Sequence, residues 1–181
     1  MGTVFSQIAD HALYPCGGDT CNHCGRSGVP IYVYTGEIVH SELAADPEDA
    51  EADPEVYEVC ARCILGGNLV KSSVSVKEVA RSLAPNGRVR DHLIAEYHRM
   101  PDIPLFVQWD DWPHCCGEWC EFQGVPASYD ESKRVPADDA YWDRGPKPWS
   151  YGAALMPESL QEVSRFRCQT CGKRYFTWQS T

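Results

Sequence analysis

The chain of 181 residues has 26 acidic and 16 basic side chains, a formal net charge of −10, and 43% hydrophobic residues. This composition is typical of a globular protein with one core or two small modules, and it argues against a protein that coats phosphate backbones. The chain begins without the charged and apolar regions of a secretory signal, and no apolar run is long enough to span a membrane. We therefore expect the ten cysteines in a reducing cytoplasm, where paired cysteines bind metals more often than they form disulfides.

The first predicted element is a strand. Residues 29–40 are rich in β-branched and aromatic side chains, which favours a strand or a hairpin about Gly36. Residues 42–58 then contain eight acidic side chains and no basic one. We expect this segment to be a solvated surface loop, and the alternative is an acidic face that binds a basic partner.

The middle of the chain predicts helices and the end predicts a hairpin. Apolar residues recur at helical spacing in residues 73–85, where Ser75 is a candidate N-cap, and in residues 87–100. Residues 104–109 predict a strand, and residues 125–160, rich in Pro, Gly, Asp and aromatic residues, an irregular connection. The segment "VSRFRCQTCGKRYFTWQS" at the C-terminus predicts two strands joined by a cysteine-containing turn.

Three cysteine pairs have the Cys-x-x-Cys spacing, in which a tight turn directs two sulfurs at one ion. They are Cys21/Cys24, Cys60/Cys63 and Cys168/Cys171. Gly25 and Gly172 follow two of these pairs and permit the positive φ that such a turn tends to need. The pair Cys60/Cys63 lacks the glycine, so we expect it to open a helical turn, where free N–H groups favour thiolates.

Six ligands are two short of two tetrahedral zinc sites, and "HCCGEWC" must supply the others. In a helical turn, Cys116 and Cys120 share one face because they are four residues apart, whereas Cys115 points elsewhere. We therefore predict Cys116 and Cys120 as ligands, with His114 or Cys115 as the alternative. Cys16 lies outside these pairs and is predicted not to bind metal.

Sequential pairing is the simplest arrangement, with Cys21/Cys24 joined to Cys60/Cys63 and Cys116/Cys120 joined to Cys168/Cys171; interleaved pairing is the alternative. Sites closed by four sulfurs indicate two structural zinc ions rather than catalytic ones. No histidine motif of a zinc hydrolase and no phosphate loop is present. A redox role for one pair is the second interpretation, although no thioredoxin-like context surrounds any pair.

These observations predict an α+β fold of two small zinc-stabilised modules, built from zinc-knuckle or zinc-ribbon hairpins with a few helices between them. The expected segments are an N-terminal zinc module (1–70), a helical connector (71–105) and a C-terminal module resembling a zinc ribbon (106–181). One compact domain is the alternative organisation.

The order of the motifs resembles the CbrC family, which is associated with tolerance to a nuclease colicin. The likeness runs from about Cys21 to Trp178 and rests on "CNHCG", "CARCILGG", "RMP", "CGEWCEFQG" and "FRCQTCGKRYFTW". Ala61 stands where the family usually has proline, and Cys115 where it usually has histidine. The resemblance implies a bacterial cytoplasmic zinc protein with a link to bacteriocin tolerance, and it implies no catalytic residue.

Three functions follow as hypotheses. The first is a non-enzymatic zinc protein that binds a basic protein, such as a nuclease toxin, through acidic surface. The second is a nucleic-acid or ribosome adaptor, suggested by basic residues among the aromatic residues of the last hairpin: Arg165, Arg167, Lys173, Arg174, Tyr175, Phe176 and Trp178. The third is an enzyme that uses carboxylates near the second site: Asp110, Asp111, Glu118 and Glu121.

Overall fold

The computed structural model describes residues 2–39, 55–83, 87–106, 110–142 and 157–179. The chain divides into two compact units. The first unit is Tyr14–Ile103, and the second unit combines Met1–Leu13 with Pro104–Thr181. Most of the acidic segment lies outside the described residues, but its end, from Glu55, is the beginning of a strand rather than loop.

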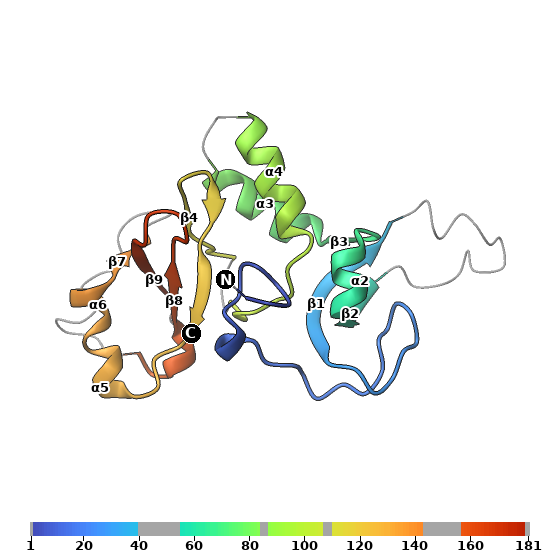
Figure 1. Cartoon of the computed structure of the whole chain (residues 1–181), viewed down its shortest axis with the longest axis horizontal. Helices are drawn as coiled ribbons and strands as arrows, with labels where there is room; N and C mark the ends of the chain where they lie inside the picture. Colours follow the sequence, from blue (N-terminus) through green and yellow to red (C-terminus); the bar gives the residue numbers. More distant parts are fainter. Residues whose placement is uncertain (1, 40–54, 84–86, 107–109, 143–156, 180–181) are drawn as a thin grey trace. The chain divides into compact units, whose positions relative to one another are not determined.

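The first unit is built on an antiparallel sheet of three strands in the order β2-β1-β3 (Figure 1). Its strands are β1 (Ile31–Ile38), β2 (Glu55–Cys60) and β3 (Leu69–Lys71). The predicted strand over 29–40 is therefore confirmed, and the hairpin about Gly36 is not formed, because Gly36 lies inside β1 and pairs with both neighbours. Between β2 and β3, helix α2 (Ala61–Gly66) ends at Gly67, whose φ of 79° is left-handed.

Helices α3 (Ser73–Ser82) and α4 (Gly87–Tyr97) follow β3 and confirm the two predicted helices. The N-cap is Ser72 rather than the predicted Ser75, because the Ser72 side chain accepts a hydrogen bond from the N–H of Ser75 at 3.4 Å. The apolar core of the first unit draws on the sheet, α2, both longer helices and the segment after them: Ile31, Tyr34, Val56, Val59, Ile64, Leu69, Val79, Leu93, Tyr97, Met100 and Ile103. These helices therefore belong to the first unit, whereas the sequence predicted them as a connector between modules.

The second unit contains a mixed sheet of four strands in the order β6-β8-β9-β7 (Figure 1). The strands are β6 (Glu121–Gly124), β7 (Ala140–Tyr141), β8 (Val163–Arg167) and β9 (Arg174–Trp178). Strands β8 and β9 form the predicted C-terminal hairpin. Phe166 is central to the core, since its ring lies 5.5 Å from the rings of both Trp112 and Phe122.

The N-terminal residues pack in the second unit, a long-range contact that their sequence does not indicate. Phe5 and Ile8 are buried, and the N–H of Ala9 donates to the carbonyl oxygen of Phe122 at 2.9 Å. The short 3₁₀ helix η1 (Asp10–Ala12) follows. The predicted N-terminal module, residues 1–70, therefore differs from the observed first unit at both ends.

The predicted irregular connection is partly structured. Its described part contains the short helices α5 (Tyr129–Ser132) and α6 (Val135–Asp138), strand β7 and, after residues 143–156, which lie outside the described residues, the 3₁₀ helix η3 (Leu160–Glu162). Residues 104–106 are not in a strand, contrary to prediction, and residues 107–109 lie outside the described set. The fold is α+β, with few helices and several small sheets, as predicted. Along the described stretches, no helix combines the length and the apolar character that crossing a bilayer requires.

Candidate metal centres

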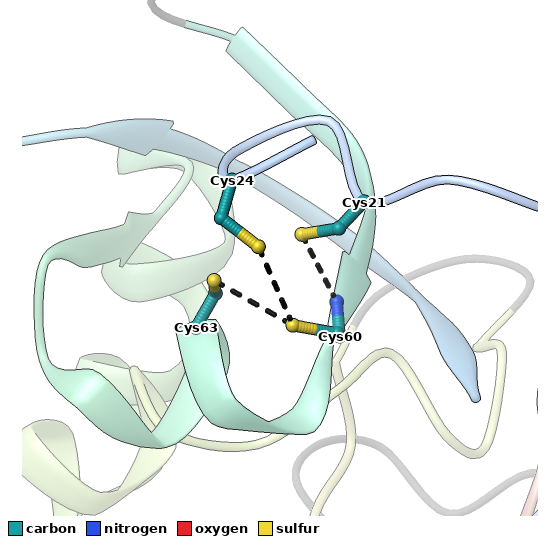
Figure 2. Close-up of side chains that lie close together, drawn as sticks. All are labelled: Cys21, Cys24, Cys60 and Cys63. Atoms are coloured by element: carbon teal, nitrogen blue, oxygen red, sulfur yellow. Dashed lines mark hydrogen bonds between the residues drawn. The ribbon is translucent and has the colours of Figure 1, made fainter. Parts of the chain in front are cut away.

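The first unit brings together the four cysteines that sequential pairing predicts. Figure 2 shows the side chains of Cys21, Cys24, Cys60 and Cys63 converging from a loop, the end of β2 and the first turn of α2. Cys60 is the N-cap of α2, so this pair opens a helix as expected. The four sulfur atoms all lie within 4.8 Å of one another.

The spacing of these sulfur atoms matches a tetrahedral thiolate site. The Sγ of Cys60 lies 3.9 Å from that of Cys24 and 3.6 Å from that of Cys63. A tetrahedron with zinc–sulfur bonds of about 2.3 Å has sulfur–sulfur edges of about 3.8 Å. The group can therefore hold one tetrahedral metal ion without rearrangement of the backbone.

Both Cys-x-x-Cys-Gly turns have the same backbone hydrogen bonds. The N–H of Gly25 donates to the carbonyl of Cys21 at 2.9 Å, and that of Gly172 donates to the carbonyl of Cys168 at 2.9 Å. In each turn the N–H of the first cysteine also donates to the carbonyl five residues later: Cys21 to Arg26 at 2.9 Å, and Cys168 to Lys173 at 2.8 Å. Gly25 and Gly172 have φ of 67° and 73°, as their sequence position predicted. The two units thus use one local device to present two sulfurs.

The second unit brings together a different set from the one predicted: Cys115, Cys116, Cys168 and Cys171. The Sγ of Cys115 lies 3.8 Å from that of Cys116 and 3.7 Å from that of Cys171, which again matches tetrahedral edges. Two of these cysteines, Cys116 and Cys171, are exposed. This group can therefore also hold one metal ion, with a more open side than the first group has.

The prediction that Cys120 lies in this group is wrong in the structure, because residues 114–119 form no helical turn. Strands β4 (His114–Cys115) and β5 (Glu118–Trp119) pair as a tight hairpin. Its two central residues, Cys116 and Gly117, have φ of 55° and 83°, as a type I′ turn requires. This turn brings Cys115 and Cys116 to the same group, whereas Cys120 follows the hairpin and is fully buried.

A left-handed backbone at Cys116 is uncommon for a residue with a side chain. Cys116 is the one described non-glycine residue with positive φ. Such conformations cost of order 1–3 kcal/mol and gather at functional sites, where the surrounding structure imposes them. The sequence signal for this hairpin was the pair Cys116-Gly117 at the turn, although Cys-Gly is a weaker hairpin signal than Asn-Gly.

Backbone hydrogen bonds prepare one thiolate in the first group. Burial raises the pKa of Cys21, but hydrogen bonds from backbone N–H groups, first that of Cys60, outweigh it and lower the pKa to about 6. The Cys60 N–H lies 3.3 Å from this sulfur (Figure 2). By contrast, burial raises the pKa of Cys63. Cys21 is therefore expected to lose its proton more readily than Cys63, whose proton a bound cation would displace.

The second group has the same division of roles. A hydrogen bond from the backbone N–H of Lys173 lowers the pKa of Cys171 to about 7. Hydrogen bonds with the side chains of Cys115 and Cys171 raise the pKa of Cys116 to about 12. A cation that binds here displaces protons from the other thiols, so acid weakens its binding.

Two residues outside the predicted set support the groups. The hydroxyl of Tyr175 donates to the Sγ of Cys115 at 3.3 Å, and the side-chain oxygen of Asn22 accepts from the N–H of Glu58 at 2.7 Å. The first contact orients a sulfur, and the second fixes the loop of Cys21 and Cys24 against β2. Neither role could be read from spacing alone.

The other candidate residues lie outside the groups. The N–H of Cys16 donates to the carbonyl of Ile31 at 2.8 Å, and Cys16 is absent from the first group, as predicted. The ring of His114 packs against Trp119 and Trp142. His114 is therefore a packing residue rather than a substitute ligand.

Two of the four carboxylates proposed for catalysis, Glu118 and Glu121, accept hydrogen bonds from neighbouring side chains. Glu121 is buried and accepts hydrogen bonds from Gln123, at 2.7 Å, and from Gln169. Glu118 is exposed and accepts from the hydroxyl of Thr170 at 3.0 Å. Asp111 is buried. These contacts describe a supporting network around the second group.

The cysteine motifs also carry the resemblance to the CbrC family. Groups of four sulfurs occur in unrelated zinc proteins, so their geometry does not test that resemblance. Family membership therefore stays a prediction. Comparisons of the chain with protein-family models, with curated proteins and with solved structures found no match.

Proposed function

We propose that the protein carries two structural zinc ions, one in each unit, and acts by binding a partner rather than by catalysis. The observation that carries the metal assignment is that eight cysteines form two groups of four, each within 4.8 Å. Sets of four thiolates suit zinc or iron, and zinc requires no redox chemistry. In both groups zinc would complete a site that connects segments far apart in the chain.

Metal analysis tests this assignment directly. Protein purified from cells under reducing conditions should contain two zinc ions per chain by inductively coupled plasma mass spectrometry, and native mass spectrometry should give the same number. Iron would add visible absorption from sulfur-to-iron charge transfer. One ion per chain, none, or iron in place of zinc would overturn the proposal.

The closed ligand sets support a non-enzymatic role. Catalytic zinc keeps one position for water or substrate, and here four sulfurs complete each tetrahedron. The carboxylates beside the second group bond to Gln123, Gln169 and Thr170. We therefore propose that the ions hold the two units in shape and take no part in chemistry.

Charge supports a basic protein as the partner. Eight thiolates and two zinc ions change the formal charge from −10 to about −14. A chain of this charge attracts a cationic domain at long range, and salt screens the attraction. We propose a cytoplasmic bacterial protein of the CbrC type whose partner is a basic protein such as a nuclease toxin, with residues 42–58 as the acidic surface.

A variant with Asn and Gln in place of the eight acidic residues of 42–58 tests the partner assignment. In a bacterium that is sensitive to a nuclease colicin, the native protein should raise survival and the variant should not. Association with the purified toxin should also be slower for the variant and less dependent on salt. Equal survival with and without the native protein would contradict the toxin assignment, and zinc content should not change in the variant.

The second candidate, a nucleic-acid adaptor, loses part of its basis in the terminal hairpin. Tyr175 and Phe176 are buried, so these rings are core and do not form a stacking surface. Arg165 pairs with Glu131 and Asp139. Filter binding at low salt separates the two candidates, because retention of RNA or DNA would favour the adaptor.

A further inference from the structure

The second unit contains a surface depression of about 600 Å³ that the zinc groups do not use. Three arginines line it, Arg165 and Arg167 from β8 and Arg174 from β9, and we call it the arginine depression. Val125 and Ala127 supply apolar contact, and two acidic side chains, Glu131 and Asp139, also line the depression.

The strand register places the three positive charges together. Arg165 and Arg167 are two residues apart on β8, so they share one face of the sheet, and Arg167 lies directly opposite Arg174 on β9. Like charges at directly opposed positions destabilise a sheet. In a chain of net charge −10, this concentration of positive charge is an unfavourable arrangement that a bound anion would relieve.

A buried carboxylate positions two of the arginines. The side chain of Asp139 is 1% exposed; its Oδ2 accepts from the Nε of Arg165 at 2.9 Å, and its Oδ1 lies 3.0 Å from the Nε of Arg174. Arg165 also donates through Nη1 to Glu131 at 2.7 Å, and Arg174 through Nη2 to the carbonyl of Asp138 at 2.8 Å. These bonds fix both guanidinium planes in advance of any ligand.

Within the part of the chain that the structure describes, several guanidinium donors have no acceptor. A guanidinium has five N–H donors on three nitrogen atoms. The contacts above engage Nε and Nη1 of Arg165 and Nε and Nη2 of Arg174, so Nη2 of Arg165 and Nη1 of Arg174 can still donate to a ligand. Arg167 is exposed, and among the residues that the structure describes no carboxylate lies within ion-pair distance of it. The depression therefore offers donors from three arginines to an incoming group.

We propose that the arginine depression binds a small organic anion through its carboxylate or phosphate group. Guanidinium groups match both oxyanions in geometry and charge. Three arginines against Glu131 and Asp139 leave a surplus of one positive charge, which a single oxyanion neutralises. A volume of about 600 Å³ lies in the range of small-molecule sites, and the exposed side chains of Val125 and Ala127 supply apolar contact for the body of the ligand.

Nuclear magnetic resonance titration of the zinc-loaded, ¹⁵N-labelled full chain tests the proposal. The probes are inorganic phosphate and acetate, each added at constant ionic strength set with sodium chloride. We expect saturable shifts of the amides of Arg167, Gly172 and Arg174, with a dissociation constant of about 1–10 mM for the preferred probe. The probe with the lower dissociation constant identifies the ligand: phosphate indicates a phosphate compound, and acetate indicates a carboxylate compound. Shifts that fail to saturate with both probes would overturn the proposal.

Two matched variants distinguish binding in the arginine depression from a general attraction of anions to positive charge. Arg167→Gln should weaken binding of the preferred probe at least tenfold, and its exposed position makes unfolding an improbable cause. Arg134→Gln removes the same charge from an exposed position outside the depression and should leave the dissociation constant unchanged. Equal effects of both variants, or none from Arg167→Gln, would overturn the proposal. Zinc analysis of the same samples should give two ions per chain in each variant. A failure of the anion proposal can then be told apart from a failure of the zinc assignment.

Discussion

Cys115 and Cys120 differ in their place relative to the β4–β5 hairpin and in burial, and these two properties decide which of them joins the second sulfur group. The turn at Cys116 and Gly117 folds Cys115 back toward Cys171, to a sulfur–sulfur distance of 3.7 Å. Cys120 is fully buried, and burial raises the pKa of its thiol, which disfavours its thiolate form.

Substitution of these two cysteines should therefore have opposite effects on metal content. Cys115→Ser should lose about one zinc ion per chain, because three thiolates bind zinc less tightly than four. Cys120→Ala should keep both ions, although the buried site makes it less stable. Zinc analysis after gel filtration in reducing buffer measures both, and Cys16→Ser is the control with unchanged content. Loss of zinc from Cys120→Ala would contradict the observed grouping.

His98 is the centre of a half-buried polar contact in the first unit. The N–H of Lys71 donates to its Nδ1 at 3.0 Å, and the hydroxyl of Tyr34 donates to its carbonyl at 2.8 Å. The side chain of Lys71 is 1% exposed, pairs with Asp102 and lies over the ring of Tyr34. Burial, and then the charge of Lys71, lower the pKa of His98 below its ordinary value of 6.5. The imidazole is thus held neutral, as an acceptor.

This contact predicts a specific dependence of stability on pH. The unfolded state takes up a proton on this histidine near pH 6.5 and the folded state only at lower pH. The contribution of His98 to stability is therefore complete above that value and is lost as the pH falls through the lowered folded pKa. His98→Asn keeps an acceptor near the Nδ1 position and cannot titrate in this range.

Urea unfolding of both proteins between about pH 8 and pH 5 measures the effect. The free energy of unfolding should fall less steeply for His98→Asn than for the native chain as the pH is lowered. Because both proteins have the same cysteines, loss of zinc in acid affects them alike and the difference isolates His98. Parallel profiles would show that His98 does not contribute.

Strand β1 is an element whose packing depends on one glycine. Its pairing with β2 shifts register between Val33 and Gly36, and at Gly36 it pairs with both neighbouring strands. A Cβ at Gly36 would lie 2.3 Å from the carbonyl oxygen of Val70, much closer than real atoms approach. The sheet therefore needs glycine at this position because β3 approaches the backbone so closely.

Gly36→Ala should lower the free energy of unfolding of the first unit by about 2 kcal/mol, because strand β3 must move away to admit the methyl group. Gly66→Ala is the matched control: it adds the same methyl group at the end of α2, where no atom beyond its chain neighbours and the backbone of its own helix lies within 4 Å of the added Cβ. This control should be neutral or slightly stabilising. Urea unfolding followed by tyrosine fluorescence and circular dichroism compares them, since all six tryptophans lie outside the first unit. Equal stability of the two variants would contradict the close approach.

At the scale of the whole molecule, each unit has one sulfur group, one Cys-x-x-Cys-Gly turn and one apolar core. Small units of this kind depend on a metal because their cores alone offset little of the entropy of folding. A metal ion in each group would join segments that are far apart in sequence: Cys24 and Cys60 in the first unit, Cys116 and Cys168 in the second.

Loss of one metal should therefore loosen one unit and spare the other. For Cys60→Ser we expect faster amide hydrogen exchange in the described residues of Tyr14–Ile103, and unchanged exchange in those of Pro104–Thr181. Cys168→Ser should give the reverse pattern. Hydrogen exchange followed by mass spectrometry measures both regions in one experiment. Uniform loosening in either variant would mean that the two units fold as one.

The sequence by itself determined the local features of this protein. The turns at Gly25 and Gly172 and the helix that begins after Cys60 follow from residues within about five positions of one another, and the terminal hairpin pairs two strands that one of these turns joins. The partnership of the first two cysteine pairs was also the simplest arrangement along the chain, and the structure brings those pairs together.

The tertiary structure alone decided which sulfurs complete the second group and which segments share a core. Cys115 enters that group because residues 114–119 pair as a hairpin, whereas a sequence spacing of four residues fits a helix equally well. Ile8 joins the second unit through its contact with Phe122, more than a hundred positions away. Spacing encodes the conformation of a tight turn, but the direction of a side chain and the partner of a strand depend on burial against distant residues, which local pattern does not contain.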